Sequence, residues 1–406
     1  MDKENRLDEI LLAYRKNCIA DSSEYSTVTS MGNEEHTIQA HLEAILQQTL
    51  PPKEIHLFIE AKDRTYDRIM EVLKNYGYTK RFEDIIEEHL KEDEWGWDKH
   101  LIVKLERYST NGKPDVIIYR SIGDVLGKGL SINWLVRKGY INTPYFLQFD
   151  ADADPEKDFA RKLLCSIKEA EKYYNIAGIY GYAHEVAEKD GLEAKLIADY
   201  GYNIYKRVSH VIFRNAWNYF EFCGTMEGTH IMFKTDVYKK IPRPLDTLAG
   251  DMAHSWELHS RGYVVLENIY AFDTVREISS FKGIIKQRLK WNSGPIQNLY
   301  IRGFQTIKRI NNFHQKLKAA FVIGYISFVS PIYQSFWLIG PTVLYLTDVW
   351  KLHQSLGFYV IDFLIHLGAA IYAKKYLSKI HEIYKNEKWT EFLKKFLSFY
   401  FIFRIP

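Results

Sequence analysis

The chain has 406 residues, of which 26% are charged, and its formal net charge is only +3. This length suits one large catalytic domain with an appendage, or two domains. The nearly balanced charge provides no global basic field, so nucleic acid is not expected as a partner. The cysteines, Cys18, Cys165 and Cys223, show neither zinc spacing nor a CxxC motif. They indicate a reducing compartment in which the thiols are buried or incidental.

The first half of the chain alternates short β-rich runs with helical stretches. Residues 1–24 lack the continuous apolar core of a signal peptide and are expected to form a short amphipathic helix or a disordered segment. Strands are predicted at 25–31, 55–60, 115–120, 145–149 and 177–183. Helices are predicted around Ile38–Leu46, with Asn33 as the cap, and at 64–76, 128–138 and 156–172. The charged segment 77–113 is interpreted as an insertion, and 184–222 as helical.

Three aspartates follow a predicted strand in the run PYFLQFDADADP. Strand–helix alternation predicts an α/β fold with a mostly parallel sheet, in which ligands bind beyond the carboxyl ends of the strands. Asp150 and Asp152 lie two residues apart, so an extended chain directs both carboxylates to the same side. They repel each other unless water solvates them or a cation such as Mg²⁺ or Mn²⁺ lies between them, and such a cation also binds phosphate. The alternative is a solvated turn, and Asp154, before Pro155, is interpreted as a helix N-cap.

Apolar runs are concentrated toward the C-terminus. Residues 319–346 contain no charged residue, and a second run at 356–373 carries Asp362 and His366. A third run ends the chain. A spanning helix needs about 20 apolar residues. Basic residues precede the first run and follow the second, so the positive-inside rule predicts a helical hairpin with the large N-terminal part in the cytoplasm. Core helices of a soluble protein are the alternative for these runs.

Five motifs in sequence order resemble the GT-A glycosyltransferases of family 2, in the superfamily of cellulose, chitin and hyaluronan synthases. The motifs are TVTSMGNEEHTIQAHLEAILQQTLPPKEIHLFIEAKDRT, LGKGLSINWLV, FLQFDADADP, LAGDMAHSWELHSRGYVV and KQRLKWNSG, and they span about residues 26–294. The segment CGTMEGTHIMFK is similar to the family's loop beside the acceptor. The resemblance implies the GT-A fold, a nucleotide-sugar donor and C-terminal membrane helices.

The resemblance implies roles for the acidic residues. Asp150 would contact the nucleotide or its diphosphate, and Asp152 would be the metal ligand, with Asp150 beside the same metal. Asp251 would be the catalytic base that removes the proton of the acceptor hydroxyl in an inverting transfer. The family's usual Glu before this base is Gly250 here. An alternative for Asp251 is the N-cap of a helix at 252–261.

The resemblance also implies a donor-binding signature near residue 290. Gln287 and Trp291 would belong to a Gln-x-x-Arg-Trp element that closes over the donor diphosphate and the acceptor. The Arg of this element is Lys290 here, a point charge where a bidentate fork is expected, and the adjacent Arg288 could compensate. Trp291 offers a flat apolar surface for a sugar ring, and the alternative is a core or interfacial tryptophan.

Further nucleotide-sugar contacts are expected at the ends of the first two strands. Asn33 follows the first strand, and either Glu60 or Asp63 supplies the acidic residue after the second. Lys128 would approach the diphosphate, although a solvated loop lysine is an equally simple interpretation. Histidines that could complete a metal site are His230, His254 and His259, but a lone histidine is more often a packing or surface residue.

We therefore expect a metal-dependent, inverting glycosyltransferase that uses a nucleotide-sugar, foremost a UDP-sugar, and a glycan or lipid-linked acceptor at a membrane. Expected regions are a catalytic domain at 25–300 facing the cytoplasm, an interfacial segment at 301–318, and a multi-pass membrane region at 319–406 with two to three helices. A processive polysaccharide synthase and a single-transfer lipid glycosyltransferase both remain open. A nucleotidyltransferase that uses the same carboxylates and a non-catalytic membrane scaffold are the alternatives of other classes.

Overall fold

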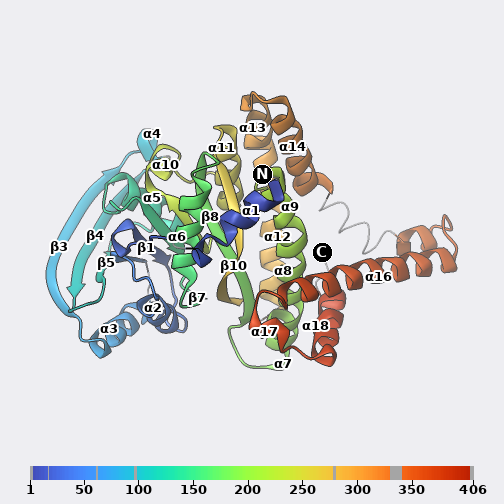
Figure 1. Cartoon of the computed structure of the whole chain (residues 1–406), viewed down its shortest axis with the longest axis horizontal. Helices are drawn as coiled ribbons and strands as arrows, with labels where there is room; N and C mark the ends of the chain where they lie inside the picture. Colours follow the sequence, from blue (N-terminus) through green and yellow to red (C-terminus); the bar gives the residue numbers. More distant parts are fainter. Residues whose placement is uncertain are drawn as a thin grey trace. The chain divides into compact units, whose positions relative to one another are not determined.

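A computed structural model describes residues 3–16, 18–60, 63–95, 98–277, 280–329 and 341–402. The chain forms two compact units. Unit 1 comprises Met1–Tyr182 and Thr225–Thr274, and unit 2 comprises Ala183–Gly224 and Val275–Pro406. Figure 1 shows the path of the chain, coloured from the N-terminus to the C-terminus. Each unit is built from two separate stretches of sequence.

A ten-stranded mixed sheet is the framework of unit 1, and the ends of β8 and β10 continue into unit 2. The strands are β1 (Tyr25–Met31), β2 (Glu54–Ile59), β3 (Thr79–Leu90), β4 (Lys99–Ser109), β5 (Asp115–Ser121), β6 (Tyr145–Phe149), β7 (Ala153–Pro155), β8 (Ile176–Ala187), β9 (His230–Lys234) and β10 (Val264–Glu277). Their order is β3-β4-β5-β2-β1-β6-β9-β8-β10-β7. The pairs β1–β2, β1–β6 and β2–β5 are parallel, whereas β3–β4, β4–β5, β6–β9 and β8–β9 are antiparallel. The α/β prediction is confirmed, but the parallel strands are the centre of a mixed sheet rather than most of it.

The direction of strand addition reverses at β1. The chain runs outward from β1 to β2 and β5, and then returns to place β6 on the other side of β1. Thr29 of β1 is paired with Phe149 at the end of β6, and Met31 is paired with Ile59 at the end of β2. Open α/β sheets bind ligands where the strand order reverses, beyond the carboxyl ends of the strands. The segments that follow Met31 and Phe149 flank this point.

Helices cover both faces of the parallel strands. The helices of unit 1 are α1 (Lys3–Leu11), η1 (Ala13–Arg15), η2 (Ser22–Glu24), α2 (Ile38–Leu46), α3 (Thr65–Asn75), α4 (Glu92–Trp95), α5 (Gly127–Arg137), α6 (Phe159–Ala170), α10 (Thr235–Lys240) and α11 (Gly250–Ser260). Phe146 of β6 contacts Tyr238 of α10. Phe149 of the same strand contacts His41 of α2 and Phe159 of α6. Strand residues three apart point to opposite faces, so α10 covers one face of the sheet, and α2 and α6 cover the other.

Two predicted helix caps are wrong. The N-cap of α2 is Thr37, not Asn33, so Asn33 remains in the loop after β1. The helix predicted to start after Asp154 begins only at Phe159, and its N-cap is Asp158. Here tertiary pairing overrides the local signal, because the residues around Asp154 join the sheet as β7 and leave no room for a helical turn.

The charged insertion forms an antiparallel hairpin of β3 and β4 that extends the sheet beyond β5. Figure 1 shows β3 as a long curved strand at the outer edge of the sheet. Nearly the whole of β3 is exposed, including Phe82 and Ile85. Its many charged side chains protect an edge strand that would otherwise pair with another chain.

A disulfide joins Cys18 to Cys165 of α6 across a sequence separation of 147 residues. The two Cα atoms lie 5.9 Å apart, which is a normal distance for a disulfide. The N-terminal helix α1 contacts α6, so the fold brings together two cysteines whose spacing carries no signal. The prediction of isolated thiols is wrong for this pair. A reducing compartment was inferred from those thiols, so the disulfide removes the basis for that inference. Cys223 is buried and has a free thiol.

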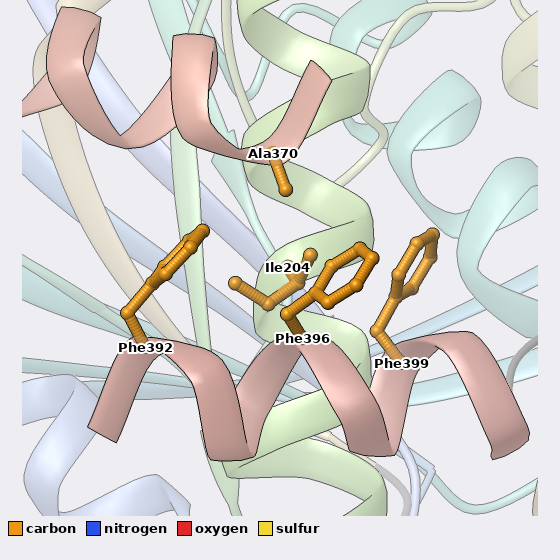
Figure 2. Close-up of a cluster of buried hydrophobic side chains, with 5 residues drawn as sticks. All are labelled: Ile204, Ala370, Phe392, Phe396 and Phe399. Atoms are coloured by element: carbon orange, nitrogen blue, oxygen red, sulfur yellow. The ribbon is translucent and has the colours of Figure 1, made fainter. Parts of the chain in front are cut away.

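Unit 2 is mainly helical. Its helices are α7 (Leu192–Ala194), η3 (Lys195–Tyr202), α8 (Asn203–Val208), η4 (Ser209–Arg214), α9 (Asn215–Phe220), α12 (Phe281–Asn298), η5 (Leu299–Gly303), α13 (Phe304–Arg309), α14 (Phe313–Gly324), η6 (Tyr325–Val329), α16 (Leu352–Leu377), α17 (Glu382–Lys385) and α18 (Trp389–Ile402). The predicted helical segment 184–222 is confirmed from Leu192 to Phe220, where α7 to α9 follow one another without a break, but its first residues are the end of β8. Ile204 of α8 is buried against Ala370 of α16 and against Phe392, Phe396 and Phe399 of α18 (Figure 2).

A buried ionic network joins the same helices. Arg207 of α8 is 1% exposed and donates two hydrogen bonds, of 2.6 and 2.8 Å, to the carboxylate of Glu387. Lys374 of α16 and Lys395 of α18 also reach this carboxylate, at 3.2 and 2.9 Å. Burial alone would raise the pKa of Glu387, but the hydrogen bonds and positive charges of Arg207 and Lys395 lower it to about 2.

One helix among the described residues, α16, is long and apolar enough to cross a membrane, judged by length and composition. It contains the second predicted run. The first predicted run extends through α14 and η6, and its residues 330–340 lie outside the described residues. Two to three spans were expected, so the multi-pass prediction is not supported. Within α16, the buried Asp362 is paired with His366 and accepts a hydrogen bond from Tyr400 of α18.

Candidate active site

The turn after β6 meets residues from two distant motifs. The backbone N–H of Asp150 donates to the carbonyl of Thr229, at 3.0 Å. Lys128, in the first turn of α5, pairs with the Asp150 carboxylate and donates to the carbonyl of Gly228 at 2.7 Å. The same carbonyl accepts a hydrogen bond of 2.5 Å from the Gln148 amide. Asp150 and Lys128, which were predicted separately as donor contacts, therefore form a pair beside a loop that leads into β9.

Negative charge accumulates beyond this pair. Asp152 in the same turn and Asp154 in the adjoining β7 are partly exposed. Asp273 of β10 is fully buried, and its Oδ2 lies 3.3 Å from Nδ1 of His230. Burial raises the pKa of Asp273 well above its usual range, and the charges of Asp154 and Asp150 raise it further. The carboxylates of Asp154 and Asp150 therefore disfavour a further negative charge on Asp273.

Asp251 lies in the first turn of α11, which begins at Gly250. A negative side chain there interacts favourably with the helix dipole. The Asp251 carboxylate packs closely against Gly228. A Cβ added to Gly228 would lie 2.4 to 2.5 Å from three atoms of that carboxylate. The carbonyl of Gly228 contacts Lys128, and its Cα faces Asp251. One residue thus connects the Asp150–Lys128 pair with the predicted base.

Arg243 is a site residue that the sequence did not reveal. Its Nη1 lies 2.6 Å from Oδ1 of Asp251, and its side chain is 14% exposed. A Cβ added to Gly250 would lie 2.8 Å from Nε of Arg243. The absence of the family's usual Glu at Gly250 is the one sequence signal for this arrangement, because the missing side chain leaves the space that the guanidinium fills.

The two candidates for the acidic residue after β2 have different partners. Glu60 accepts hydrogen bonds from the N–H groups of Leu126 and Gly127, at 2.5 and 3.0 Å, and so caps the start of α5. Burial raises the pKa of Glu60, although those hydrogen bonds oppose the shift. Asp63 accepts hydrogen bonds from Thr65, whose N–H lies 3.0 Å away, and these lower its pKa although burial alone would raise it. Asn33 is exposed in the loop after β1.

Each of the three histidines is buried among its own packing partners. His254 donates from Nε2 to the carbonyl of Ile241 at 2.8 Å, and burial lowers its pKa to about 4. Burial lowers the pKa of His259 to about 3. His230 contacts Thr229 and donates from Nε2 to the carbonyl of Gly181 at 3.1 Å. These contacts are those of packed core histidines.

The predicted donor-binding signature lies in unit 2, on α12. Gln287 accepts a hydrogen bond of 2.8 Å from Tyr202. The guanidinium of Arg288 lies 4.7 Å from the ring centre of Tyr205 and 5.5 Å from that of Trp291, within cation–π range. Lys290 is exposed. Arg288 therefore lies among aromatic rings, whereas Lys290, at the position of the Arg in the resembling motif, is exposed.

A divalent cation fits the donor set of the turn after β6. Carboxylate oxygens such as those of Asp150 and Asp152 are the ligands that Mg²⁺ and Mn²⁺ prefer. Within the described residues, no group of three or more His, Cys, Asp or Glu side chains is arranged to hold a metal ion. Mg²⁺ commonly binds through one or two carboxylates and completes its coordination with substrate phosphates and water. The two aspartates match this kind of shared site.

No sequence family and no curated protein matches the chain. Among solved structures, it is similar to the mannosyltransferase PcManGT from Pyrobaculum calidifontis in complex with GDP-Man and Mn²⁺, with 12% identity, a TM-score of 0.47 and coverage of 98% of this chain and 95% of the other. It is similar to S. aureus TarS 1–349 in complex with UDP-GlcNAc, with 12% identity, a TM-score of 0.42 and coverage of 93% and 90%. The glucosyl-3-phosphoglycerate synthase from Mycobacterium tuberculosis, in complex with Mn²⁺, UDP and glucosyl-3-phosphoglycerate, gives 12% identity, a TM-score of 0.36 and coverage of 67% and 76%.

Proposed function

We propose that this chain transfers a sugar from a nucleotide-sugar to an acceptor hydroxyl, with inversion at the sugar carbon. The observation that carries the proposal is the connected set Asp150, Lys128, Gly228 and Asp251 in unit 1. These residues come from four separate sequence segments, and they meet beyond the carboxyl end of β6, where open α/β sheets bind ligands. In such a set Asp150 and Lys128 would bind the diphosphate, and the carboxylate of Asp251 can accept a proton.

Each residue of the set has a distinct part in the proposed reaction. Asp150 and Asp152 would hold Mg²⁺ or Mn²⁺, which when bound stabilises negative charge on the leaving diphosphate. Lys128 supplies a positive charge beside the same turn and would contact a phosphate oxygen. Asp251 removes the proton of the acceptor hydroxyl as that oxygen attacks the sugar carbon. One base and one in-line displacement are sufficient for an inverting transfer.

The donor class follows from the resemblance of the five motifs. A UDP-sugar is the first candidate, with Asn33 and Asp63 at the nucleotide. Gln287 and Trp291, which belong to unit 2, are candidates for donor binding through the motif resemblance alone. Glu60 is less suited to direct nucleotide contact, because its carboxylate already caps the start of α5. A glycan or a lipid-linked acceptor suits an enzyme that works at a membrane, by processive or single transfer.

The test is release of nucleoside diphosphate by the purified full chain from a panel of UDP- and GDP-sugars, with Mn²⁺ and with EDTA. Asp251→Asn should lower turnover by about 10²- to 10⁴-fold, the usual contribution of a general base. Asp236→Asn is the matched control, because Asp236 also lies in the first turn of a helix and is exposed. Turnover of nucleoside triphosphates instead would support a nucleotidyltransferase. Absence of all turnover would support the scaffold interpretation.

Attachment to an anionic membrane surface is part of the same proposal. Residues 278–347 contain no Asp or Glu. They do contain nine basic residues, which are Lys282, Lys286, Arg288, Lys290, Arg302, Lys308, Arg309, Lys316 and Lys318. Large apolar side chains are exposed at intervals of four residues along two of the helices: Phe281, Ile285 and Leu289 on α12, and Phe313, Leu317 and Phe321 on α14. Basic helices with an exposed apolar stripe bind the interface of anionic bilayers.

Flotation with lipid vesicles tests this attachment separately from catalysis. The chain should float with vesicles of phosphatidylcholine and phosphatidylserine at low salt, and less with phosphatidylcholine alone. Raising the ionic strength should weaken binding to the anionic vesicles, because salt screens the attraction between basic residues and headgroups. Equal flotation with both kinds of vesicle at all salt concentrations would contradict the electrostatic part of the proposal.

A further inference from the structure

The guanidinium of Arg243 occupies a space that Gly250 leaves open, and the side chain passes Gly129 at ordinary contact distance. A Cβ added to Gly250, at the start of α11, would lie 2.8 Å from Nε and 3.1 Å from Nη2 of Arg243. A Cβ added to Gly129, in the first turn of α5, would lie 2.7 Å from Leu245 and 3.7 Å from Cδ of Arg243. The side chain of Arg243 therefore lies beside the starts of both helices, and a side chain at Gly250 would obstruct it.

The backbone of Arg243 is held by hydrogen bonds from α5. Asn133 of α5 donates from Nδ2 to the carbonyl of Arg243 at 2.9 Å, and its Oδ1 accepts from the N–H of Arg243 at 3.2 Å. Oδ1 of Asn133 also accepts a hydrogen bond of 3.0 Å from the hydroxyl of Tyr238. The amide of Asn133 thus engages both peptide groups of one residue. These two hydrogen bonds fix the backbone position of Arg243, from which its side chain extends.

The position is electrostatically unfavourable for a cation unless an anion compensates it. Helix N-termini carry partial positive charge, and Arg243 lies beside the N-termini of α5 and α11. Its compensating anion is Asp251, whose Oδ1 lies 2.6 Å from Nη1 of Arg243. Opposite charges this close attract each other more strongly where the surrounding protein partly excludes water. The orientation of the Asp251 carboxylate and the position of Arg243 therefore depend on each other.

We propose that Arg243 is a positioning residue for Asp251, an inference that rests on the proposed glycosyl transfer. Arg243 engages Oδ1 of Asp251 and directs Oδ2 toward the acceptor. The acceptor oxygen forms its bond to the sugar carbon while the bond from that carbon to the diphosphate oxygen breaks, and the electron pair leaves with the diphosphate. The acceptor proton passes to Oδ2 of Asp251. Arg243 does not touch substrate in this scheme and acts only through the orientation of the base.

Arg243→Gln tests the role directly. A misplacement of about 1 Å in a reacting group can cost about 100-fold in rate, so kcat for sugar transfer should fall by about this factor. The Kd of the nucleotide-sugar should not change, because Arg243 is expected to act on the base and not on the donor. Arg261→Gln is the matched control, since Arg261 pairs with Glu257 on the same helix at 2.8 Å and is half exposed. The control should retain the parental kcat.

Gly250→Ala tests the same role from the opposite side, without altering Arg243. The added methyl group would lie inside the contact distance of the guanidinium and should displace it from Asp251. The backbone of Gly250 is helical, and alanine favours a helix more than glycine does, so the folded state should not be weakened. Gly250→Ala should therefore lose kcat with a midpoint of thermal unfolding no lower than that of the parent. A purely structural role of Arg243 would not produce this combination.

Chemical rescue completes the experiment. Millimolar guanidinium should restore part of the activity of Arg243→Ala, while the same concentration of urea or sodium should not. Full activity of Arg243→Gln or of Gly250→Ala, or a weakened nucleotide-sugar Kd with kcat unchanged, would overturn the positioning role alone. A parent chain that releases no nucleoside diphosphate from any sugar donor would overturn the proposed function, and with it this role. The two failures are therefore distinguishable.

Discussion

Replacement of Gly228 by alanine should separate catalysis from donor binding. The added Cβ would lie 2.4 Å from Oδ2 of Asp251, whereas ordinary contact begins at 3.4 Å, so the carboxylate must retreat by about 1 Å. A displacement of that size corresponds to about a 100-fold loss of kcat, or about 2.7 kcal/mol in activation free energy. The carbonyl that accepts hydrogen bonds from Lys128 and Gln148 is unchanged by the substitution. The Kd of the nucleotide-sugar should therefore stay close to the parental value.

The assay pairs steady-state release of nucleoside diphosphate with calorimetric titration of the nucleotide-sugar. Gly357→Ala is the control, because a Cβ at Gly357 meets no atom within 4 Å. Neither glycine has the positive φ that would strain alanine. Parental kcat in Gly228→Ala would refute the reasoning, since it would mean that the position of the Asp251 carboxylate does not matter. An equal loss of affinity for the nucleotide-sugar would also refute the reasoning, because it would mean that the substitution disturbs donor binding as well as the base.

The remaining predictions concern stability. Because the pKa of Glu387 is about 2 in the folded chain and 4.5 in the reference state, its ionised form contributes about 3 kcal/mol above pH 4.5, and this contribution is lost as the pH falls toward 2. Glu387→Gln should lower the free energy of unfolding by that amount at pH 7 and flatten its acid limb, whereas the exposed Glu382→Gln should do neither, as measured by urea unfolding at several pH values. For the disulfide, the chain-entropy account gives about 5 kcal/mol for a separation of 147 residues. Dithiothreitol should thus lower the urea midpoint of the parent but not of Cys18→Ser, and identical midpoints with and without the reductant would contradict a bond between Cys18 and Cys165.

The parallel centre of the sheet could be predicted because its signals are local. The predicted bounds 25–31 and 145–149 coincide with β1 and β6, whose residues are all buried and whose neighbours are turn-forming or charged. The hairpin of β3 and β4 could not be predicted in the same way. An exposed edge strand has no buried face, so its sequence lacks the alternation of apolar and polar residues that marks a half-buried strand.

The residues of the candidate site also differ in whether the sequence could predict them. Asp150, Lys128 and Asp251 carry charges in recognisable motifs, and the structure brings the first two into direct contact. Arg243 could not be found from a residue pattern, because its place is defined by the side chain that Gly250 lacks. The wrong cap at Asp154 has the opposite cause: a correct local signal was overridden when the segment joined a distant strand.

The division of each unit into two stretches has a practical consequence for anyone preparing a shorter protein. Removing the residues after 277 would delete α16 and α18 but keep α8, which belongs to the first stretch of unit 2. Ile204 would lose the side chains that enclose it, and Arg207 would lose Glu387, which leaves an uncompensated charge that costs about 3–5 kcal/mol while it stays buried. A truncated catalytic fragment should therefore aggregate through the uncovered surface of α8. Soluble preparations should instead keep the whole chain and alter only its exposed apolar side chains.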